Sequence, residues 1–181
     1  MDIMRVRIIP LNMVLLDADV IIDLHRFNIW NNIVSKNKVY ISSIILRREV
    51  YFYKDVNDVK HRIELLKNVA SKFLEISISS EELKEFLQKF DPVFEGELDE
   101  GETEALKIIH DNSNFLFCTC DKAAIKAIAL VGRSKQGISF ERLLKFSGIT
   151  KNLEPKHTEK CFKRYLKEGS IMRIQNRGIR R

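Results

Sequence analysis

Two aspartates, two positions apart, end an apolar run near the start of the chain, in the stretch VLLDAD. Asp17 and Asp19 stand where a buried strand would give way to a helix. Three further acids occupy comparable places: Glu49 after a second strand, Glu102 in DEGETEA, and Asp121 after the apolar run FLFCT. Carboxylates gathered at one place repel one another unless a cation neutralises them, and hard oxygen donors suit Mg²⁺ or Mn²⁺. These residue types therefore predict a divalent-metal centre with positions open to phosphate oxygens.

The same acids also have structural roles open to them. Asp17 and Asp121 can each cap a helix through a side-chain oxygen. Asp99 with Glu102 has the spacing of a capping box, and acids in a first helical turn are favoured by the helix dipole. An N-cap needs only one acid, so capping explains Asp17 or Asp19 but not both. Both roles stay open at this point.

Strands and helices alternate along the chain. Continuous apolar or β-branched runs predict strands at 13–17, 38–42, 74–78, 115–119 and 137–139. Periodic apolar positions and capping signals predict helices at 18–36, 43–53, 56–73, 79–90, 98–111, 121–132 and 140–148. The alternation predicts an α/β fold, a three-layer sandwich in which helices flank a mainly parallel central sheet. Strand ends in such a sheet share one edge, so the acids can converge there.

Charge divides the chain into two parts. The 181 residues fit one domain at 1–150, followed by a basic C-terminal helix and tail at 151–181. The net charge of +6 lies entirely in that extension, which carries ten Lys and Arg against three Asp and Glu. It is either a polyanion contact or a solvated end. Phe162 and Tyr165 give it one apolar face, which predicts docking on the body.

Composition excludes several classes of protein. With 45% hydrophobic residues, 7 Gly and 3 Pro, the chain can bury a core and lacks a disordered composition. No run reaches the roughly 18 apolar residues of a membrane span. The N-terminal stretch is interrupted by Pro10 and Asn12 and is interpreted as a first strand rather than a signal peptide. Three cysteines, an odd number, favour free thiols in the reducing cytoplasm.

The order of these elements resembles the PIN-domain family of metal-dependent ribonucleases. The resemblance rests on hhhDxDxhh, a Glu in the helix after the second strand, L-x-x-G-E-x-E-A opening a later helix, and hhhxTxD at a later strand end, where h is apolar. It covers roughly residues 13–147. It implies four acids that hold Mg²⁺ or Mn²⁺ and carry the reaction: Asp17, Glu49, Glu102 and Asp121. Three further residues take supporting positions: Asp19, Glu104 and Thr119.

The chain departs from the family pattern at two points. Glu102 and Glu104 compete for the role of the third acid, and the C-terminal extension is longer than a minimal domain of this kind needs. The first departure leaves one ligand open. The second leaves the role of the basic segment open.

The resemblance implies an endoribonuclease that hydrolyses RNA phosphodiester bonds, with RNA as its substrate and no membrane partner. It implies either a toxin of a toxin–antitoxin pair, covered by a small antitoxin-like protein, or an RNA-processing nuclease, and it suggests a homodimer. One alternative is a non-catalytic PIN-like RNA-binding module. Another is a haloacid-dehalogenase-like phosphatase, which also begins with hhhDxDx and uses the first Asp as nucleophile. That family has Gly-Thr after the second Asp, where this chain has Val20 and Ile21.

Overall fold

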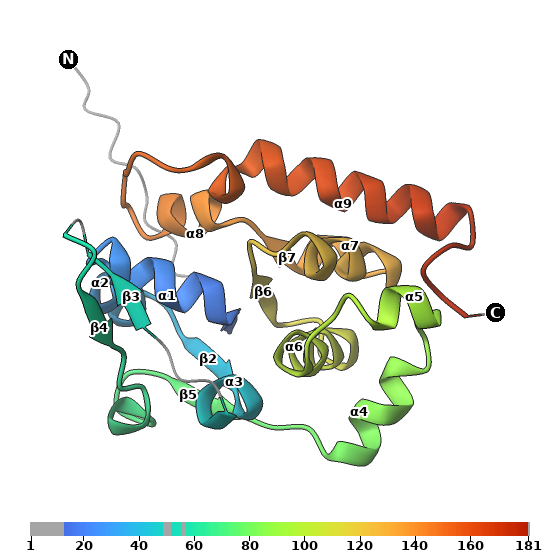
Figure 1. Cartoon of the computed structure of the whole chain (residues 1–181), viewed down its shortest axis with the longest axis horizontal. Coiled ribbons are helices and arrows are strands. Elements are labelled where there is room, and N and C mark those ends of the chain that lie inside the picture. Colours follow the sequence, from blue (N-terminus) through green and yellow to red (C-terminus); the bar gives the residue numbers. More distant parts are fainter. Residues whose placement is uncertain (1–12, 49–51, 56, 181) are drawn as a thin grey trace.

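A five-stranded sheet forms the centre of the computed structural model, which describes residues 13–48, 52–55 and 57–180 (Figure 1). The strand order is β5-β2-β1-β6-β7, and every neighbouring pair is parallel. The strands are β1 (Val14–Leu16), β2 (Val39–Ser42), β5 (Leu74–Ile76), β6 (Leu116–Cys118) and β7 (Gly137–Ile138). The chain runs from β1 outward through β2 to β5, then returns to the other side of β1, so the order reverses between β1 and β6. The predicted α/β fold with a mainly parallel sheet is confirmed.

Helices cover both faces of this sheet (Figure 1). Val14 and Leu16 of β1 face a core formed with α1, α2 and α8, whereas Leu15 faces a core formed with α4, α6, α7 and α9. This alternation of a strand buried on both sides produces the three layers. No helix in the described ranges is long and apolar enough to cross a membrane. The helices are α1 (Ala18–Arg26), α2 (Trp30–Lys36), α3 (Ser43–Arg48), α4 (Ser80–Leu87), α5 (Pro92–Glu95), α6 (Glu100–Asp111), α7 (Lys122–Leu130), α8 (Phe140–Phe146) and α9 (Glu159–Ile174).

A small hairpin and three short 3₁₀ turns complete the described elements. They are β3 (Phe52–Lys54), β4 (Lys60–Arg62), η1 (Leu66–Asn68), η2 (Ser134–Gln136) and η3 (Pro155–His157).

Three of the predicted helices differ from the structure. Of the helix predicted at 43–53, Ser43–Arg48 form α3, whereas Phe52 and Tyr53 belong to strand β3. The helix predicted at 56–73 is wrong, because the described part of this segment contains β4, which pairs antiparallel with β3, and then η1. The carboxylate of Asp55 accepts hydrogen bonds from two backbone N–H groups of the following turn, at 2.8 and 3.1 Å, and so closes the hairpin. The single helix predicted at 18–36 is two helices, because Asn28 adopts a φ of 54° and separates α1 from α2.

The C-terminal extension packs on the body of the protein, as predicted. Helix α9 lies along α7 (Figure 1), with the ring of Phe162 buried against the backbone at Gly137. Beyond α9 the chain turns back, and the Gly178 N–H donates a hydrogen bond of 2.8 Å to Asp91. An isolated bridge joins Phe90 to Ile179. The described end of the chain is therefore docked against the segment between α4 and α5.

Gly169 allows α9 to approach α7 closely. A Cβ atom at this position would lie 2.4 Å from the carbonyl oxygen of Lys126. We expect Gly169→Ala to lower the free energy of unfolding by about 1–2 kcal/mol, because overpacking against backbone outweighs the gain in helix propensity. Urea denaturation of this variant beside Lys167→Ala, an exposed α9 position, measures the effect. A Gly169→Ala protein as stable as the wild type would contradict the close contact.

Candidate functional site

A threonine hydroxyl joins two of the expected acids across the centre of the sheet. Asp17 directly follows β1, and Thr119 and Asp121 follow β6. Thr119 Oγ1 donates a hydrogen bond of 2.6 Å to Asp17 Oδ2 and accepts one of 3.0 Å from the backbone N–H of Asp121. These residues lie at the carboxyl ends of β1 and β6, where the strand order reverses. In open α/β sheets, that reversal leaves the crevice in which ligands bind.

Both aspartates are also helix N-caps. Asp17 Oδ1 accepts a hydrogen bond of 2.8 Å from the Ala18 N–H, and Asp121 Oδ1 accepts bonds of 2.6 and 3.0 Å from Ala123 and Ala124. Each carboxylate oxygen can accept two hydrogen bonds or ligands. Capping fixes the orientation of these carboxylates and still leaves lone pairs for a cation.

Glu102 brings a third acid to the same place. It forms the predicted capping box with Asp99: Asp99 Oδ1 accepts from the Glu102 N–H at 2.7 Å, and Glu102 Oε2 accepts from the Asp99 N–H at 3.0 Å. Capping does not require burial, yet Glu102 is only 6% exposed. Burial raises the pKa of Glu102 to about 9, and the negative charges of Asp17 and Asp121 add to this rise. Glu102 therefore lies within electrostatic reach of both aspartates.

Asp17 is likewise a buried acid with a raised pKa. Burial raises its pKa to about 7, although the hydrogen bonds from Thr119 and the Ala18 N–H act in the opposite direction. The charges of Asp19 and Asp99 raise it further. Acids in this state are neutralised either by protons or by a bound cation.

The donor chemistry of this acid cluster (Asp17, Asp99, Glu102 and Asp121) fits Mg²⁺ or Mn²⁺, which prefer carboxylate oxygens and retain several water ligands. Over the ranges that the structure describes, no three His, Cys, Asp or Glu side chains are grouped as a ready-made metal cage. Glu49, the second expected acid, lies outside the described residues. The fit to a cation therefore rests on the donor types and on the raised pKa values of Asp17 and Glu102.

Glu102 and Glu104, the two candidates for the third acid, have different neighbours. Glu104 is fully buried and accepts three hydrogen bonds, from Ser43 Oγ at 2.9 Å, from the Ile44 N–H at 2.9 Å and from the Ile78 N–H at 3.0 Å. These bonds tie the start of α3 to the segment before α4. Glu104 thus supports the packing of three elements, whereas Glu102 pairs with Asp99 and has its pKa raised by the charges of Asp17 and Asp121.

Asp19 follows Asp17 by two residues. It is an exposed residue in the first turn of α1. Partial burial raises its pKa, the charge of Lys156 opposes this rise, and the charges of Asp23 and Asp121 add to it. Asp19 therefore lies within electrostatic reach of Asp121 and Lys156.

A buried ionic group anchors the extension beside Asp19, and sequence reasoning missed it. Asp23 and His157 are 4% and 0% exposed. Asp23 contacts His157 Nε2 at 2.6 Å, Lys156 Nζ at 3.0 Å and Arg26 at 2.8 Å. Burial acts to raise the pKa of Asp23, but the hydrogen bonds from His157 and Lys156 lower it. Asp23 follows Asp19 by one helical turn, yet its partner is 134 residues away, a pairing that no local pattern reveals.

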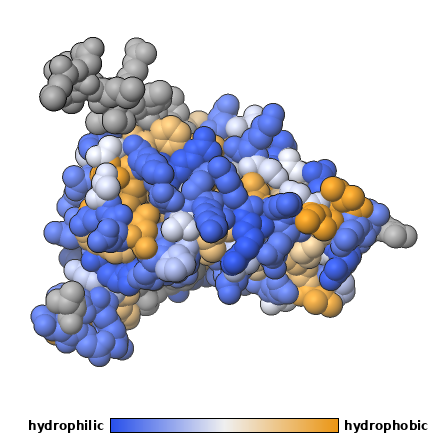
Figure 2. Space-filling view, turned by 90° about the horizontal axis from the view of Figure 1, so that it is seen from above, coloured by the Kyte–Doolittle hydropathy of each residue, from blue (hydrophilic) through white to orange (hydrophobic). Residues whose placement is uncertain are grey.

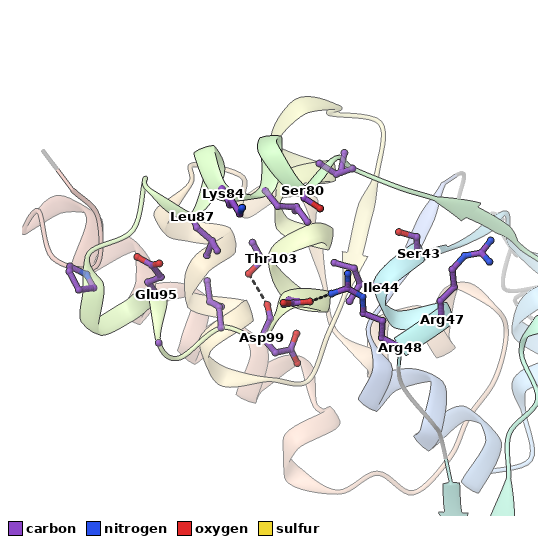
Figure 3. A pocket seen from close by; sticks show the side chains of 16 residues that line it. Ser43, Ile44, Arg47, Arg48, Ser80, Lys84, Leu87, Glu95, Asp99 and Thr103 are labelled. Atoms are coloured by element: carbon purple, nitrogen blue, oxygen red, sulfur yellow. Dashed lines mark hydrogen bonds and ion pairs between the residues drawn. The ribbon is translucent and has the colours of Figure 1, made fainter.

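A cleft of about 810 Å³ lies on the other side of Asp99, between α3, α4, α5 and the start of α6 (Figure 3). Its lining combines the apolar Leu83 and Leu87 with the polar Asp99 and Thr103. Arg48 forms an ion pair with Glu100 at the end where α3 lies. Asp17 and Asp121 are not among the residues that line this cleft. The cleft therefore adjoins the acid cluster through Asp99 without containing it.

The fold and the acid cluster define an α/β protein with carboxylates near the switch point of its sheet. Comparisons of the chain with models of protein families, with curated proteins and with solved structures find no match. The interpretation of the site therefore depends on its residues and their geometry.

Proposed function

We propose that the chain is a divalent-metal-dependent endoribonuclease that hydrolyses phosphodiester bonds in RNA. The observation that carries this proposal is the Thr119 hydroxyl, which links the Asp17 carboxylate to the Asp121 backbone at the switch point, while the charges of both aspartates raise the pKa of Glu102. Strongly raised carboxyl pKa values in a crevice are typical of functional sites, because such a cluster lowers the stability of the fold. The resemblance to PIN domains supports the same reaction.

The residues of the acid cluster have distinct roles in this proposal. Asp17, Glu102 and Asp121 would hold the cation, with Glu49 as a fourth acid. A bound Mg²⁺ or Mn²⁺ supplies a polarised water for in-line attack and neutralises charge on the phosphate. Thr119 positions Asp17 through its hydrogen bond. One of the carboxylates would accept the proton that the attacking water loses.

Replacement of the two aspartates tests this function. Asp17→Asn and Asp121→Asn should each lower the rate of RNA cleavage at least about 100-fold with Mn²⁺ or Mg²⁺, because each removes a ligand charge. Asp58→Asn is a matched control, since Asp58 is exposed in the β3–β4 turn with a φ of 62°, which asparagine tolerates. Cleavage of a panel of RNAs measures the effect. Undiminished cleavage by both variants would refute the proposed metal-dependent mechanism.

The two alternative classes give different results in the same proteins. A non-catalytic RNA-binding module would bind RNA without metal-dependent cleavage and without carboxylate-dependent Mn²⁺ binding. A phosphatase would trap BeF₃⁻ at Asp17 as a mimic of a phosphoaspartate. Either result would replace the ribonuclease proposal.

The proposed ribonuclease function also suggests a cellular location, a biological role and an oligomeric state. The structure has three free cysteines, two of them buried, which is compatible with the reducing cytoplasm that we propose as its location. In this proposal, the protein is either a toxin, with a small antitoxin-like protein as its partner, or an RNA-processing nuclease. A homodimer is proposed on the family resemblance alone.

A further inference from the structure

Three basic side chains surround one tyrosine where α7 and α9 meet. Arg164 Cζ lies 4.5 Å from the centre of the Tyr165 ring, Lys126 Nζ 5.6 Å and Lys122 Nζ 5.9 Å. The Arg164 guanidinium also donates a hydrogen bond of 2.6 Å to the Tyr165 hydroxyl. Cations are attracted to the faces of an aromatic ring. Tyr165 thus holds three cations of two different helices at one place.

The positive charge of this α7–α9 basic cluster (Lys122, Lys126, Arg164 and Tyr165) is largely uncompensated. Glu168 pairs with Lys126 at 3.2 Å. Lys122 and Arg164 are exposed, and among the residues the structure describes neither forms an ion pair with a carboxylate. Like charges so close together repel one another, and a polyanion would relieve that repulsion.

The basic cluster lies directly beside the acid cluster. Lys122 is the first residue of α7, and Asp121, its N-cap, belongs to the acid cluster. Lys156 of the same extension pairs at 3.0 Å with Asp23 of α1, one helical turn after Asp19. The face of the molecule that carries α9 is mostly hydrophilic over its middle (Figure 2). Positive charge from the extension therefore borders the acids on the side of α7 and α9.

The C-terminal end of the extension differs from the basic cluster in its contacts and in its hydropathy. Arg180 forms an ion pair of 2.9 Å with Glu95 of α5, and the guanidinium of Arg173 packs against Gly132 at the end of α7. Apolar residues also emerge there (Figure 2), and Ile174 is 81% exposed. The half of the extension that faces the acid cluster is thus its N-terminal half.

We propose that Lys122, Lys126 and Arg164, held around Tyr165, bind the phosphate backbone of RNA and lead the strand to the acid cluster. This inference rests on the proposed ribonuclease function. The recognised chemistry is a row of phosphodiesters, so binding is independent of base sequence. Arginine presents a planar fork to phosphate oxygens, and the two lysines act as point charges.

RNA binding without cleavage tests this surface. A fluorescent single-stranded RNA is titrated in EDTA at several salt concentrations, and its anisotropy is measured. The triple variant Lys122→Gln, Lys126→Gln, Arg164→Gln should bind about 10- to 100-fold more weakly at low salt. The slope of log K against log salt should fall in magnitude by about 2, since each lost phosphate contact on a single strand removes about 0.7.

The matched control removes three positive charges from the other end of the extension, with Arg173→Gln, Arg177→Gln and Arg180→Gln. It should keep the slope close to that of the wild type. An equal or larger loss in this control, or an unchanged slope in the first triple variant, would overturn the proposal. So would tighter binding of polyglutamate than of RNA, which would assign the surface to an acidic protein. A single-stranded DNA of equal length should bind through the same residues.

These measurements distinguish a failure of the RNA-binding proposal from a failure of the nuclease proposal. Asp17→Asn should bind RNA in EDTA at least as tightly as the wild type, because it leaves the basic cluster intact and removes one negative charge. Weakened binding in the first triple variant, together with no cleavage by any protein, would uphold the surface and refute the nuclease. Aspartate-dependent cleavage together with unchanged RNA binding by the first triple variant would uphold the nuclease and refute the basic surface.

Discussion

Glu102→Gln is expected to make the protein more stable and to abolish RNA cleavage. Burial raises the pKa of Glu102 from an ordinary value of 4.5 to about 9, so ionisation of this group is unfavourable in the folded state. The folded protein then binds more protons than the unfolded chain between these values, and its stability falls as the pH rises from about 4.5 to about 9. Glutamine is neutral and can still accept the hydrogen bond of the capping box.

The gain in stability has a defined pH dependence. In EDTA at pH 7.5, the free energy of unfolding of Glu102→Gln should exceed that of the wild type by about 2–4 kcal/mol, a rise in Tm of about 5–10 °C. The difference should vanish near pH 4.5 and reach its maximum near pH 9. Urea denaturation at these three pH values measures it. Cleavage with Mn²⁺ should fall at least about 100-fold, because a ligand charge is lost.

Glu104→Gln is the matched control and should have the opposite effects. Its carboxylate accepts bonds from one hydroxyl and two backbone N–H groups, using both oxygens. An amide nitrogen would replace one oxygen and leave at least one buried backbone N–H without an acceptor, at a loss of about 1–3 kcal/mol. Cleavage per folded molecule should persist. If Glu104→Gln abolished cleavage and Glu102→Gln retained it, Glu104 would be the third acid.

The fold could be predicted from the sequence where a local pattern determines a segment. The apolar runs around Leu15 and Phe117 are buried on both faces of the sheet, and this burial makes them continuous in sequence. The capping box of Asp99 and Glu102 was readable because its residues are three positions apart. The helix predicted at 56–73 failed because the Asp55 turn outweighs apolar periodicity over a short segment.

The candidate site could be predicted only in outline. Strand order is not encoded locally, so the sequence indicated that Asp17 and Asp121 share an edge without showing that Thr119 joins them. Glu102 and Glu104 have equivalent sequence positions, and only the contacts of α3 distinguish them. The contact between Asp23 and His157 joins residues 134 positions apart. Packing over such distances depends on the whole chain.

Mn²⁺ is expected to stabilise the protein and to displace protons when it binds. At pH 7, Glu102, with a pKa of about 9, carries a proton, and Asp17, with a pKa of about 7, carries one in about half of the molecules. A cation binds the carboxylates without these protons, so binding should release between about one and two protons per molecule. Calorimetric titration with Mn²⁺ in two buffers of different ionisation enthalpy measures that number.

The same linkage fixes the pH dependence of the affinity. The affinity for Mn²⁺ should rise about tenfold or more per pH unit between pH 6 and pH 7, and less steeply near pH 9, where Asp17 has lost its proton and Glu102 has lost about half of its own. Mn²⁺ at about 100 times its Kd should stabilise the fold by about 2.7 kcal/mol. Asp17→Asn should lose most of this stabilisation, and Asp58→Asn, with its exposed carboxylate, should keep it. Equal stabilisation of both variants, or binding that releases no protons, would show that the cation binds elsewhere and that the acid cluster is not a metal centre.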